Sequence, residues 1–451
     1  MTEVEIEGIE AQLNDFDLAV REKVLDDLGE TPPSRDSQRI PHFNLHCHTF
    51  YSYNGYGASP SRIAWEAWRR NWYAVAICDF DVLDGVEEFL NITDRLGVRA
   101  AAHMETRVIF PEYIDQVINS PGEPGVYYFM GAGFTKLPDS GSPAEAQLVK
   151  LRQGAQARNR DVLGRVNDYL SPLSLDFDTD VLPLTPAGNP TERHIVQAYH
   201  EKAIEEMGDG AADFWAGKLE LDVETVTGML TNPMTFTDTL RSKLMKAGGP
   251  GYVKPDADSF PKLEDTIEMI LGCEAIPMGT WLDGTSPGES DPEAQLECLR
   301  AKGVCAVNIV PDRNWNIEDL DVREDRIAHF HEFVAAAEAQ NMPINVGTEL
   351  NKYGQRWVDD FSAEPMRAVA DVLQRGARTM VGHTRLARFA GMAYTSENAE
   401  AEFGEDFEKK NRFYAAIGAL PPFSRAVVSY LKSKDPADNY SWLRDAVKDA
   451  I

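Results

Sequence analysis

The sequence has few cysteines, a shortage of basic residues and no long apolar run. Its five cysteines are an odd number and contain no CxxC pair. A complete disulfide framework is therefore excluded, and a reducing compartment fits best. No apolar stretch approaches the roughly 18 residues of a membrane span. The acidic start MTEVEIEGIE lacks the apolar core of a secretory signal. We therefore expect a cytoplasmic protein that does not enter a membrane.

The shortage of positive charge limits the partners. Lysine and arginine number 44 against 73 aspartate and glutamate residues, and the formal net charge is -29. Nucleic acids and anionic membranes are bound through basic side chains that neutralise phosphates, so most of this surface should repel both. A locally positive pocket can still hold a small anion. The expected partner is a small-molecule substrate, and the sequence leaves open whether the chain forms a homo-oligomer.

Short apolar runs alternate with helical patterns along the 451 residues. Strands are predicted at Phe43–Thr49, Tyr73–Asp79, Val98–Val108, Val126–Phe134, Glu274–Thr280, Val304–Val310, Ile344–Leu350 and Thr379–His383. Helical patterns between most of them predict right-handed crossovers and a parallel sheet. The fold class is therefore α/β, and the expected architecture is a TIM-like (β/α)7-8 barrel with a helical insertion.

The domain organisation follows from this alternation. The predicted segments are an N-terminal helical arm (1–40, with one helix over Glu7–Leu28), two parts of the barrel (41–190 and 272–395), an insertion between them (191–271) and C-terminal helices (396–451). The insertion has helix formers and no convincing strand. We interpret it as a cover over the barrel mouth, with a role in oligomerisation alone as the alternative.

The segment LHCHT carries the clearest chemical signal. Side chains on a strand alternate between faces, so His46 and His48 point the same way, into the barrel, and can hold one metal ion. Four later predicted strands also end in residues typical of metal binding or acid–base catalysis: Asp79 with Asp81, Glu105 with Arg107, Glu349 with Asn351, and His383 with Arg385. Active sites of such barrels gather at the carboxyl ends of the strands, so these side chains are expected to meet.

The order of these motifs resembles the PHP (polymerase and histidinol phosphatase) family of metal-dependent hydrolases. The segments HCHT, YSYNGYG, SPSRIAWEAW, ICDFD, LDGVEEF and HMETRV follow one another as the opening motifs of that family do. The resemblance implies a PHP-type barrel in which a metal-activated water hydrolyses a small-molecule ester, and in this family the ester is a phosphoester.

The chain also departs from the family's ligand pattern. Phe80 stands where the family has the histidine of Asp-His-Asp, and Asn351 stands where the closing Asp-x-His has its histidine. The set that remains is His46, His48, Glu105 and Glu349, with Glu349 in place of an aspartate. Two imidazoles and two carboxylates suit Zn²⁺, Mn²⁺ or Fe²⁺. We expect one divalent ion.

Other residues receive provisional roles. Asp79 is the first candidate for the general base, or for a partner that orients a histidine. Asp81 is either catalytic or a loop carboxylate that caps the next helix. His383 is a ligand, an acid or a core residue, whereas His103 is expected to be a buried hydrogen-bonded histidine. The expected substrate-binding residues are Arg107, Asn351, Lys352 and Arg385.

Two other functions remain open beside the hydrolase. One is a mononuclear metal-dependent lyase or isomerase that acts on a sugar or sugar acid, with Asp79 or His383 moving a proton. The other is a non-catalytic barrel that binds a metabolite. Phosphate release, turnover of a non-phosphorylated sugar and metal content distinguish the three.

Overall fold

The computed structural model describes residues 3–28 and 42–451, and a single seven-stranded sheet forms its centre. The strands are β1 (Phe43–Cys47), β2 (Ala74–Phe80), β3 (Ala100–Ile109), β4 (Val126–Ala132), β5 (Ile276–Trp281), β6 (Ala306–Ile309) and β7 (Ile344–Val346). They are hydrogen-bonded in chain order, and β1 meets the chain just after β7 at a bridge between Cys47 and Glu349. The sheet is therefore a nearly closed barrel, and the first seven predicted strands are confirmed.

The sheet is mixed, so the prediction of an all-parallel sheet is wrong at β4. Strands β1, β2 and β3 are parallel, as are β5, β6 and β7, but β4 is antiparallel to both of its neighbours. A parallel neighbour requires a crossover, usually through a helix. The connection from β3 to β4 holds only the short helical turn Pro111–Tyr113. The chain therefore reverses there instead of crossing over.

The eighth predicted strand, Thr379–His383, is also wrong, because these residues lie inside helix α15 (Ala370–Ala390). This helix is buried between β7 and α17 (Phe407–Ala419), and glycine allows the close approach. A Cβ at Gly376 would lie 1.8 Å from the carbonyl oxygen of Ile344 in β7. All five residues of Thr379–His383 are buried within α15, and a short buried stretch of helix cannot be told from a buried strand by periodicity alone.

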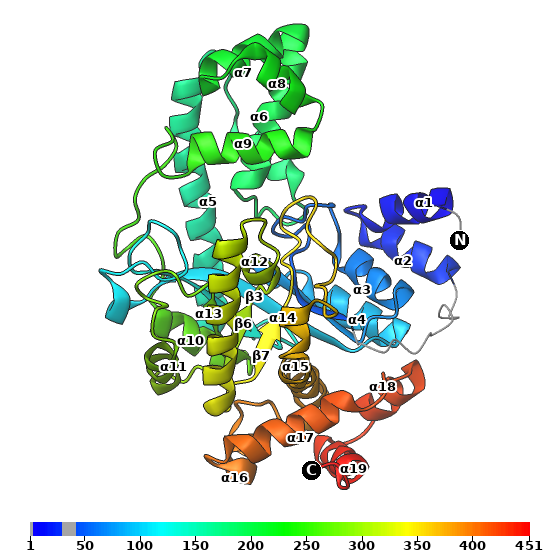
Figure 1. The fold of residues 1–451 in the computed structure, drawn as a ribbon. Coiled ribbons are helices and arrows are strands. Elements are labelled where there is room, and N and C mark those ends of the chain that lie inside the picture. The colour runs from blue at the N-terminus through cyan, green and yellow to red at the C-terminus, as the bar shows by residue number, and fades with distance from the viewer. Residues whose placement is uncertain (1–2, 29–41) are drawn as a thin grey trace.

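Helices cover the outside of the barrel (Figure 1). They are α3 (Pro60–Arg69), α4 (Val86–Leu96), α10 (Leu263–Gly272), α11 (Pro292–Ala301), α12 (Asp312–Trp315), α13 (Leu320–Ala339), α14 (Glu364–Arg367) and α15. The predicted helix Glu7–Leu28 is divided into α1 (Glu3–Leu13) and α2 (Leu18–Asp27), and Asp17 caps the second. The rest of the predicted N-terminal arm, 29–40, lies outside the described residues.

A helical lobe, residues 143–245, stands at one end of the barrel (Figure 1). It consists of the long helix α5 (Pro143–Leu170), then α6 (Glu192–Met207), α7 (Ala211–Leu219), α8 (Val223–Leu230) and α9 (Pro233–Met245), with short helical turns at Phe177–Val181, Leu182–Leu184 and Gly208–Gly210. Its apolar residues form a core of their own, centred on Tyr199, Trp215 and Phe236. The helical region thus begins at α5, earlier than predicted, and α10 packs on the barrel.

The lobe contacts the loops at the carboxyl ends of the strands. The amide of Asn189 donates to the carbonyl oxygens of Phe80, the last residue of β2, and of Tyr51, in the loop after β1. The C-terminal helices α16 (Glu397–Phe403), α17, α18 (Arg425–Lys432) and α19 (Pro436–Val447) gather at the opposite end of the molecule (Figure 1). Within the described residues, the helices are too short or too polar to cross a lipid bilayer.

Candidate metal centre

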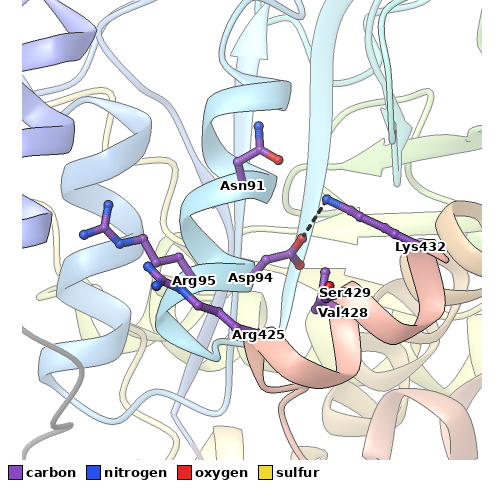
Figure 2. Close-up of a pocket in the computed structure, with 7 residues that line it drawn as sticks. All are labelled: Asn91, Asp94, Arg95, Arg425, Val428, Ser429 and Lys432. Atoms are coloured by element: carbon purple, nitrogen blue, oxygen red, sulfur yellow. Dashed lines mark ion pairs between the residues drawn. The ribbon is translucent and has the colours of Figure 1, made fainter.

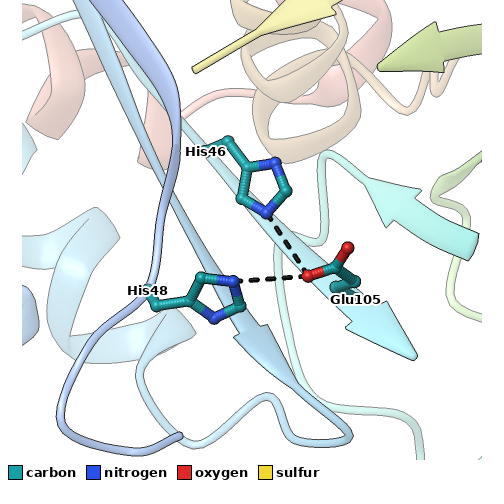
Figure 3. Close-up of side chains that lie close together, drawn as sticks. All are labelled: His46, His48 and Glu105. Carbon is teal, nitrogen blue, oxygen red and sulfur yellow. Dashed lines mark ion pairs between the residues drawn. The ribbon is translucent and has the colours of Figure 1, made fainter. Parts of the chain in front are cut away.

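Three predicted ligands converge from the carboxyl end of β1 and from the middle of β3, level with the end of β2. Nε2 of His46 lies 3.5 Å from Oε2 of Glu105, and Nε2 of His48 lies 3.3 Å from the same oxygen. Figure 3 shows both imidazoles and the carboxylate pointing toward one another. The ligand atoms of the three side chains all lie within 4.8 Å of one another, close enough to share one ion. Among the described residues, no other group of three or more histidine, cysteine or carboxylate side chains meets this condition.

The converging atoms have no hydrogen-bond partner among the described residues. This applies to Nε2 of His46, Nε2 of His48 and Oε2 of Glu105, and all three side chains are buried. Buried polar atoms are normally paired, because leaving one unpaired costs about 1–3 kcal/mol. A divalent cation at their meeting point would satisfy all three at once. Imidazole nitrogen and carboxylate oxygen are strong donors for Zn²⁺, Mn²⁺ and Fe²⁺, so the residues present fit such an ion.

The ionisation of Glu105 suits this role. Burial favours the neutral acid, but the two neighbouring imidazoles outweigh it and hold the pKa of Glu105 below its ordinary value. Burial also lowers the pKa of His46, yet Glu105 overcomes this effect and raises it. The centre therefore holds an ionised carboxylate beside two imidazoles.

The orientation of His48 is fixed by the loop that follows β1. Its Nδ1 lies 3.1 Å from the hydroxyl of Ser52, and that hydroxyl donates to Oδ1 of Asp79 at 2.7 Å. Since the hydroxyl proton goes to the carboxylate, Ser52 must accept from Nδ1–H of His48, which leaves Nε2 of the ring free to bind a metal. The ring of Phe80 stacks on the imidazole with centroids 4.3 Å apart.

Asp79 therefore acts on the metal centre indirectly, through the hydroxyl of Ser52 and the ring of His48. Its two oxygens accept from the Thr49 amide, the Thr49 hydroxyl and the Ser52 hydroxyl, each at 2.7 Å. Burial raises the pKa of Asp79. Of the two roles predicted for Asp79, this geometry favours the one in which it orients a histidine.

Asp81 lies at the end of β2, where its half-buried side chain faces β3. Its Oδ1 accepts from the hydroxyl of Thr106 at 2.5 Å, and its backbone has a positive φ of 60°. Burial raises the pKa of Asp81, and the nearby Arg158 and Arg107 oppose this effect. Because Glu105 is also close enough to raise this pKa, Asp81 lies within electrostatic reach of the centre.

The fourth predicted ligand, Glu349, is close to the centre but is not part of the converging group. Its Oε2 forms an ion pair with Nη2 of Arg313 at 2.5 Å. Its charge raises the pKa of His46, so the two residues are near each other. The contact with Arg313 was not predicted. In the sequence, Arg313 could have been noticed as a basic residue three positions after the predicted strand Val304–Val310.

Basic residues from the barrel and the helical region cluster around Phe260 and Glu192. The guanidinium groups of Arg107 on β3 and Arg158 on α5 lie over the ring of Phe260, 4.4 and 4.6 Å from its centroid. Arg241 on α9 and Lys246, directly after that helix, contact a carboxylate oxygen of Glu192 at 2.9 and 2.8 Å. Although burial favours the neutral acid, these two residues and Arg107 lower the pKa of Glu192 to about 2.

Tyr128 on β4 links this basic cluster, defined as Arg107, Arg158, Arg241 and Lys246, to the metal centre. Burial raises the pKa of Tyr128, whereas Arg107 and Arg241 lower it and Glu105 raises it. One side chain thus lies within electrostatic reach of the basic cluster and of a metal ligand. Only Arg107 of the cluster was predicted as a substrate-binding residue, because helical patterns in the lobe do not reveal which residues face the barrel.

The other predicted substrate-binding residues lie at different distances from the centre. Asn351 is half-buried in the loop after β7. Lys352, next to it, is exposed and contacts Asp238 of the lobe at 3.2 Å. Arg385 on α15 is instead buried among the C-terminal helices, where it donates to the carbonyl oxygens of Ile417, Leu420 and Pro421. The structure does not bring Arg385 to the metal centre.

Two other histidines that the sequence singled out, His383 and His103, are buried but do not belong to the ligand group. His383 lies on α15, and its ring nitrogens contact the carbonyl oxygen of Gly133 at 3.0 Å and the amide of Tyr394 at 2.9 Å. Of its three predicted roles, this placement favours a core residue. His103 accepts from the amide of Gly133 at 3.0 Å, and burial lowers its pKa to about 3. This placement agrees with the role expected for His103.

A separate pocket lies between α4 and α18 (Figure 2). It is lined by Asn91, Asp94, Arg95, Arg425, Val428, Ser429 and Lys432. Asp94 forms ion pairs with Arg388 at 2.7 Å and with Lys432 at 3.9 Å. Since this part of α4 precedes the start of β3, the pocket is at the opposite end of the barrel from Glu105.

Comparison with known proteins gives only distant likenesses. The sequence matches no family model and no curated protein. Among solved structures, an amidohydrolase from Chromobacterium violaceum with bound sulfate and no metal is 18% identical, with a TM-score of 0.47 over 74% of this chain and 96% of its own. A protein from Bifidobacterium adolescentis described as a candidate metal-dependent phosphoesterase is 14% identical, with a TM-score of 0.44 over 76% and 98%. Likenesses at this level carry no argument about function, which must come from the site.

Proposed function

We propose that this chain is a metal-dependent hydrolase of an anionic small-molecule ester, with a phosphoester as the first substrate class to test. The observation that carries the proposal is the convergence of three buried, unpartnered ligand atoms from His46, His48 and Glu105. A divalent ion bound there would polarise a substrate oxygen and make water more acidic. PHP-like motifs around these residues favour the same chemistry.

The side chains around the centre have complementary tasks in this proposal. His48 is held in the metal-binding tautomer by Ser52 and Asp79. Asp81 is the candidate that receives a proton from the attacking water, because it is half-buried and within electrostatic reach of Glu105. Asp79 suits this task less well, since both of its oxygens already accept hydrogen bonds.

In this proposal, the basic cluster selects a substrate that carries an anionic group. The chain as a whole carries a net charge of -29, yet Arg107 on β3 and Arg241 on α9 act on Tyr128, as does the ligand Glu105. Guanidinium groups bind carboxylate and phosphate through paired hydrogen bonds. A substrate with an anionic group can therefore exchange places with Glu192 as the partner of Arg241, a residue supplied by the lobe.

The rival lyase or isomerase receives less support. That reaction requires Asp79 or His383 to move a proton. Asp79 accepts three hydrogen bonds, and both ring nitrogens of His383 have backbone partners, at Gly133 after β4 and at Tyr394 after α15. His383 therefore has no ring nitrogen left for a substrate, and Asp79 already uses three of its roughly four acceptor positions.

Metal content is the first test. Elemental analysis of the purified protein should find one equivalent of Zn²⁺, Mn²⁺ or Fe²⁺ per chain, and the His46→Ala/His48→Ala double variant should contain none. The absence of metal after growth in medium supplemented with all three would reject the proposal and favour the non-catalytic barrel. Two or more equivalents in the wild type would contradict the expectation of a single ion.

The substrate class is tested next, with the metal-loaded protein. Release of phosphate from a panel of phosphomonoesters and phosphodiesters supports the proposal, whereas turnover of a non-phosphorylated sugar acid supports the lyase or isomerase. Arg241→Gln should raise KM for anionic substrates. Arg160→Gln is the matched control, because Arg160 is also a lobe arginine paired with a carboxylate but lies on the exposed face.

A further inference from the structure

Glu349 and Arg313 form an ion pair beside the metal centre. We propose that Arg313 holds Glu349 away from the metal, and that an anionic group of the substrate, by binding Arg313, releases Glu349 to become a fourth ligand. This inference rests on the proposed metal centre. It assigns Arg313 as a residue that couples substrate binding to metal binding.

The position of Glu349 makes this exchange geometrically reasonable. Its carbonyl oxygen accepts from the amide of His48 at 2.7 Å, and its backbone pairs with Cys47 across the closure of the barrel. The side chain therefore starts next to the two ligand histidines. It is buried, and its charge acts on His46, yet its Oε2 lies 2.5 Å from Arg313. A change of side-chain rotamer can redirect this carboxylate toward the centre.

The backbone at this point is fixed, so only the side chain is free to change. Glu349 and Leu350 have φ values of +67° and +55°, a left-handed conformation that is uncommon for residues other than glycine. It is held by the His48 contact and by a hydrogen bond from the amide of Gly55 to the carbonyl oxygen of Leu350 at 2.8 Å. A Cβ at Gly55 would lie 2.3 Å from the backbone of Lys352, so the two loops pack together only with glycine there.

Arg313 is accessible where Glu349 is not. Its side chain is 46% exposed, against 9% for Glu349. It lies on α12, directly after β6, so it faces the same end of the barrel as the ligands. A guanidinium has five N–H donors in one plane, and this arrangement can form paired hydrogen bonds with either a carboxylate or a phosphate. An incoming anion can therefore replace Glu349, and the released carboxylate is then attracted to the divalent cation.

Binding of the anion and of the metal must then strengthen each other. If an anion improves metal affinity, the metal improves anion affinity by the same factor, because both belong to one thermodynamic cycle. The coupling runs through a single side chain, so removing Glu349 should abolish it while the three other ligands remain. This gives a test with metal binding alone as the readout.

The experiment measures Zn²⁺ affinity by competition with a chromophoric chelator, for the full chain with Arg313→Gln, Glu349→Gln and both changes together. Arg313→Gln should bind Zn²⁺ about tenfold tighter or more, the size expected when an outer contact of a ligand changes. Glu349→Gln alone should be close to wild type, and the double variant should match it. Arg313→Lys, which keeps the charge, should behave as wild type. Arg356→Gln is the matched control, because Arg356 is equally exposed at 46% but pairs with Asp312.

A second measurement uses sulfate as the anionic probe, with chloride at the same ionic strength as the reference. Sulfate should tighten Zn²⁺ binding by the wild type and not by Glu349→Gln. The inference would be overturned if Arg313→Gln increased Zn²⁺ affinity equally in the presence of Glu349 and in the Glu349→Gln background. Such a result would mean that the metal responds only to the loss of a nearby positive charge. A loss of affinity in Glu349→Gln as large as in Glu105→Gln would also overturn it, because Glu349 would then already be a ligand. If the wild type binds no metal, the proposed function itself fails.

Discussion

Replacing Asp79 with asparagine separates the two roles that the sequence left open for this residue. In the structure Asp79 accepts three hydrogen bonds from Thr49 and Ser52, and Ser52 in turn contacts Nδ1 of His48. Asparagine keeps the shape and one acceptor oxygen, but it places an NH₂ group against the hydroxyl of Thr49. The change should therefore loosen the loop that orients His48.

The magnitude follows from these contacts. A hydrogen bond to a charged group contributes about 1.5–3 kcal/mol and a neutral one about 1 kcal/mol, so losing one and weakening two costs about 3 kcal/mol. In a chain of 451 residues, the unfolding entropy makes this a shift in Tm of only about 3 °C. Metal affinity is the sharper assay, because outer contacts of a ligand histidine change it by about 10–100-fold. We expect Asp79→Asn to bind Zn²⁺ that much more weakly, still at one equivalent.

Two further variants control for the loss of stability. Ser52→Ala breaks the link to His48 and should weaken Zn²⁺ binding by about tenfold. Thr49→Val removes a hydrogen bond to Asp79 but leaves that link in place, so metal affinity should change little. If Asp79 is instead the general base, Asp79→Asn will bind metal normally and lose about 10²–10⁴-fold in kcat. That result would refute the positioning role.

Two predictions concern stability away from the metal centre. Burial, together with the charge of Asp312, raises the pKa of Asp359 to about 6. The folded state therefore keeps this proton at a pH where the unfolded chain has lost it, and stability falls as pH rises from about 4 to about 6. In urea titrations, Asp359→Asn should be more stable than wild type by about 1–3 kcal/mol at pH 7 and equally stable at pH 4. The same difference in stability at both pH values would contradict the argument. Gly133→Ala should destabilise the fold by more than about 3 kcal/mol, because its Cβ would lie 2.1 Å from the ring of His383. Gly141→Ala is the control, since Gly141 has a similar positive φ but no neighbour within 4 Å, and this change should cost about 1 kcal/mol. Similar losses for the two glycine variants would show that the ring can move.

The strands could be predicted because their apolar runs are short and bounded by turn residues. The direction of β4 could not, since nothing within Val126–Ala132 records how the chain arrives there. The error at Thr379–His383 has a different cause. The run Thr379, Met380 and Val381 fits a strand, but the close packing of Gly376 and Gly382 against β7 and α17 identifies a buried helix. That information depends on which segments become neighbours after folding.

The metal centre shows the same division between local and distant information. His46 and His48 could be predicted as a pair because the alternation of a strand places both on one face. Glu105 could be predicted because it ends an apolar run, and in the sheet its strand β3 is separated from β1 by β2 alone. The contact between Arg313 and Glu349 joins loops after β6 and β7, and neither loop has a pattern that indicates it. The basic residues of the lobe depend on the packing of α5 and α9 over the barrel, which local periodicity does not record.

Two of the departures from the PHP pattern, at Phe80 and Glu349, also have a structural counterpart. Phe80, in place of a histidine, stacks on the ring of His48 and so supports an existing ligand instead of offering another. Glu349, in place of an aspartate, is long enough to reach Arg313 while its backbone stays beside His48. A second ion would need its own set of strong donors to offset its desolvation, and a phenyl ring supplies none. Both substitutions act on the environment of a single ion, which is why we expect metal stoichiometry to remain at one equivalent even when Arg313 is removed and Glu349 becomes available.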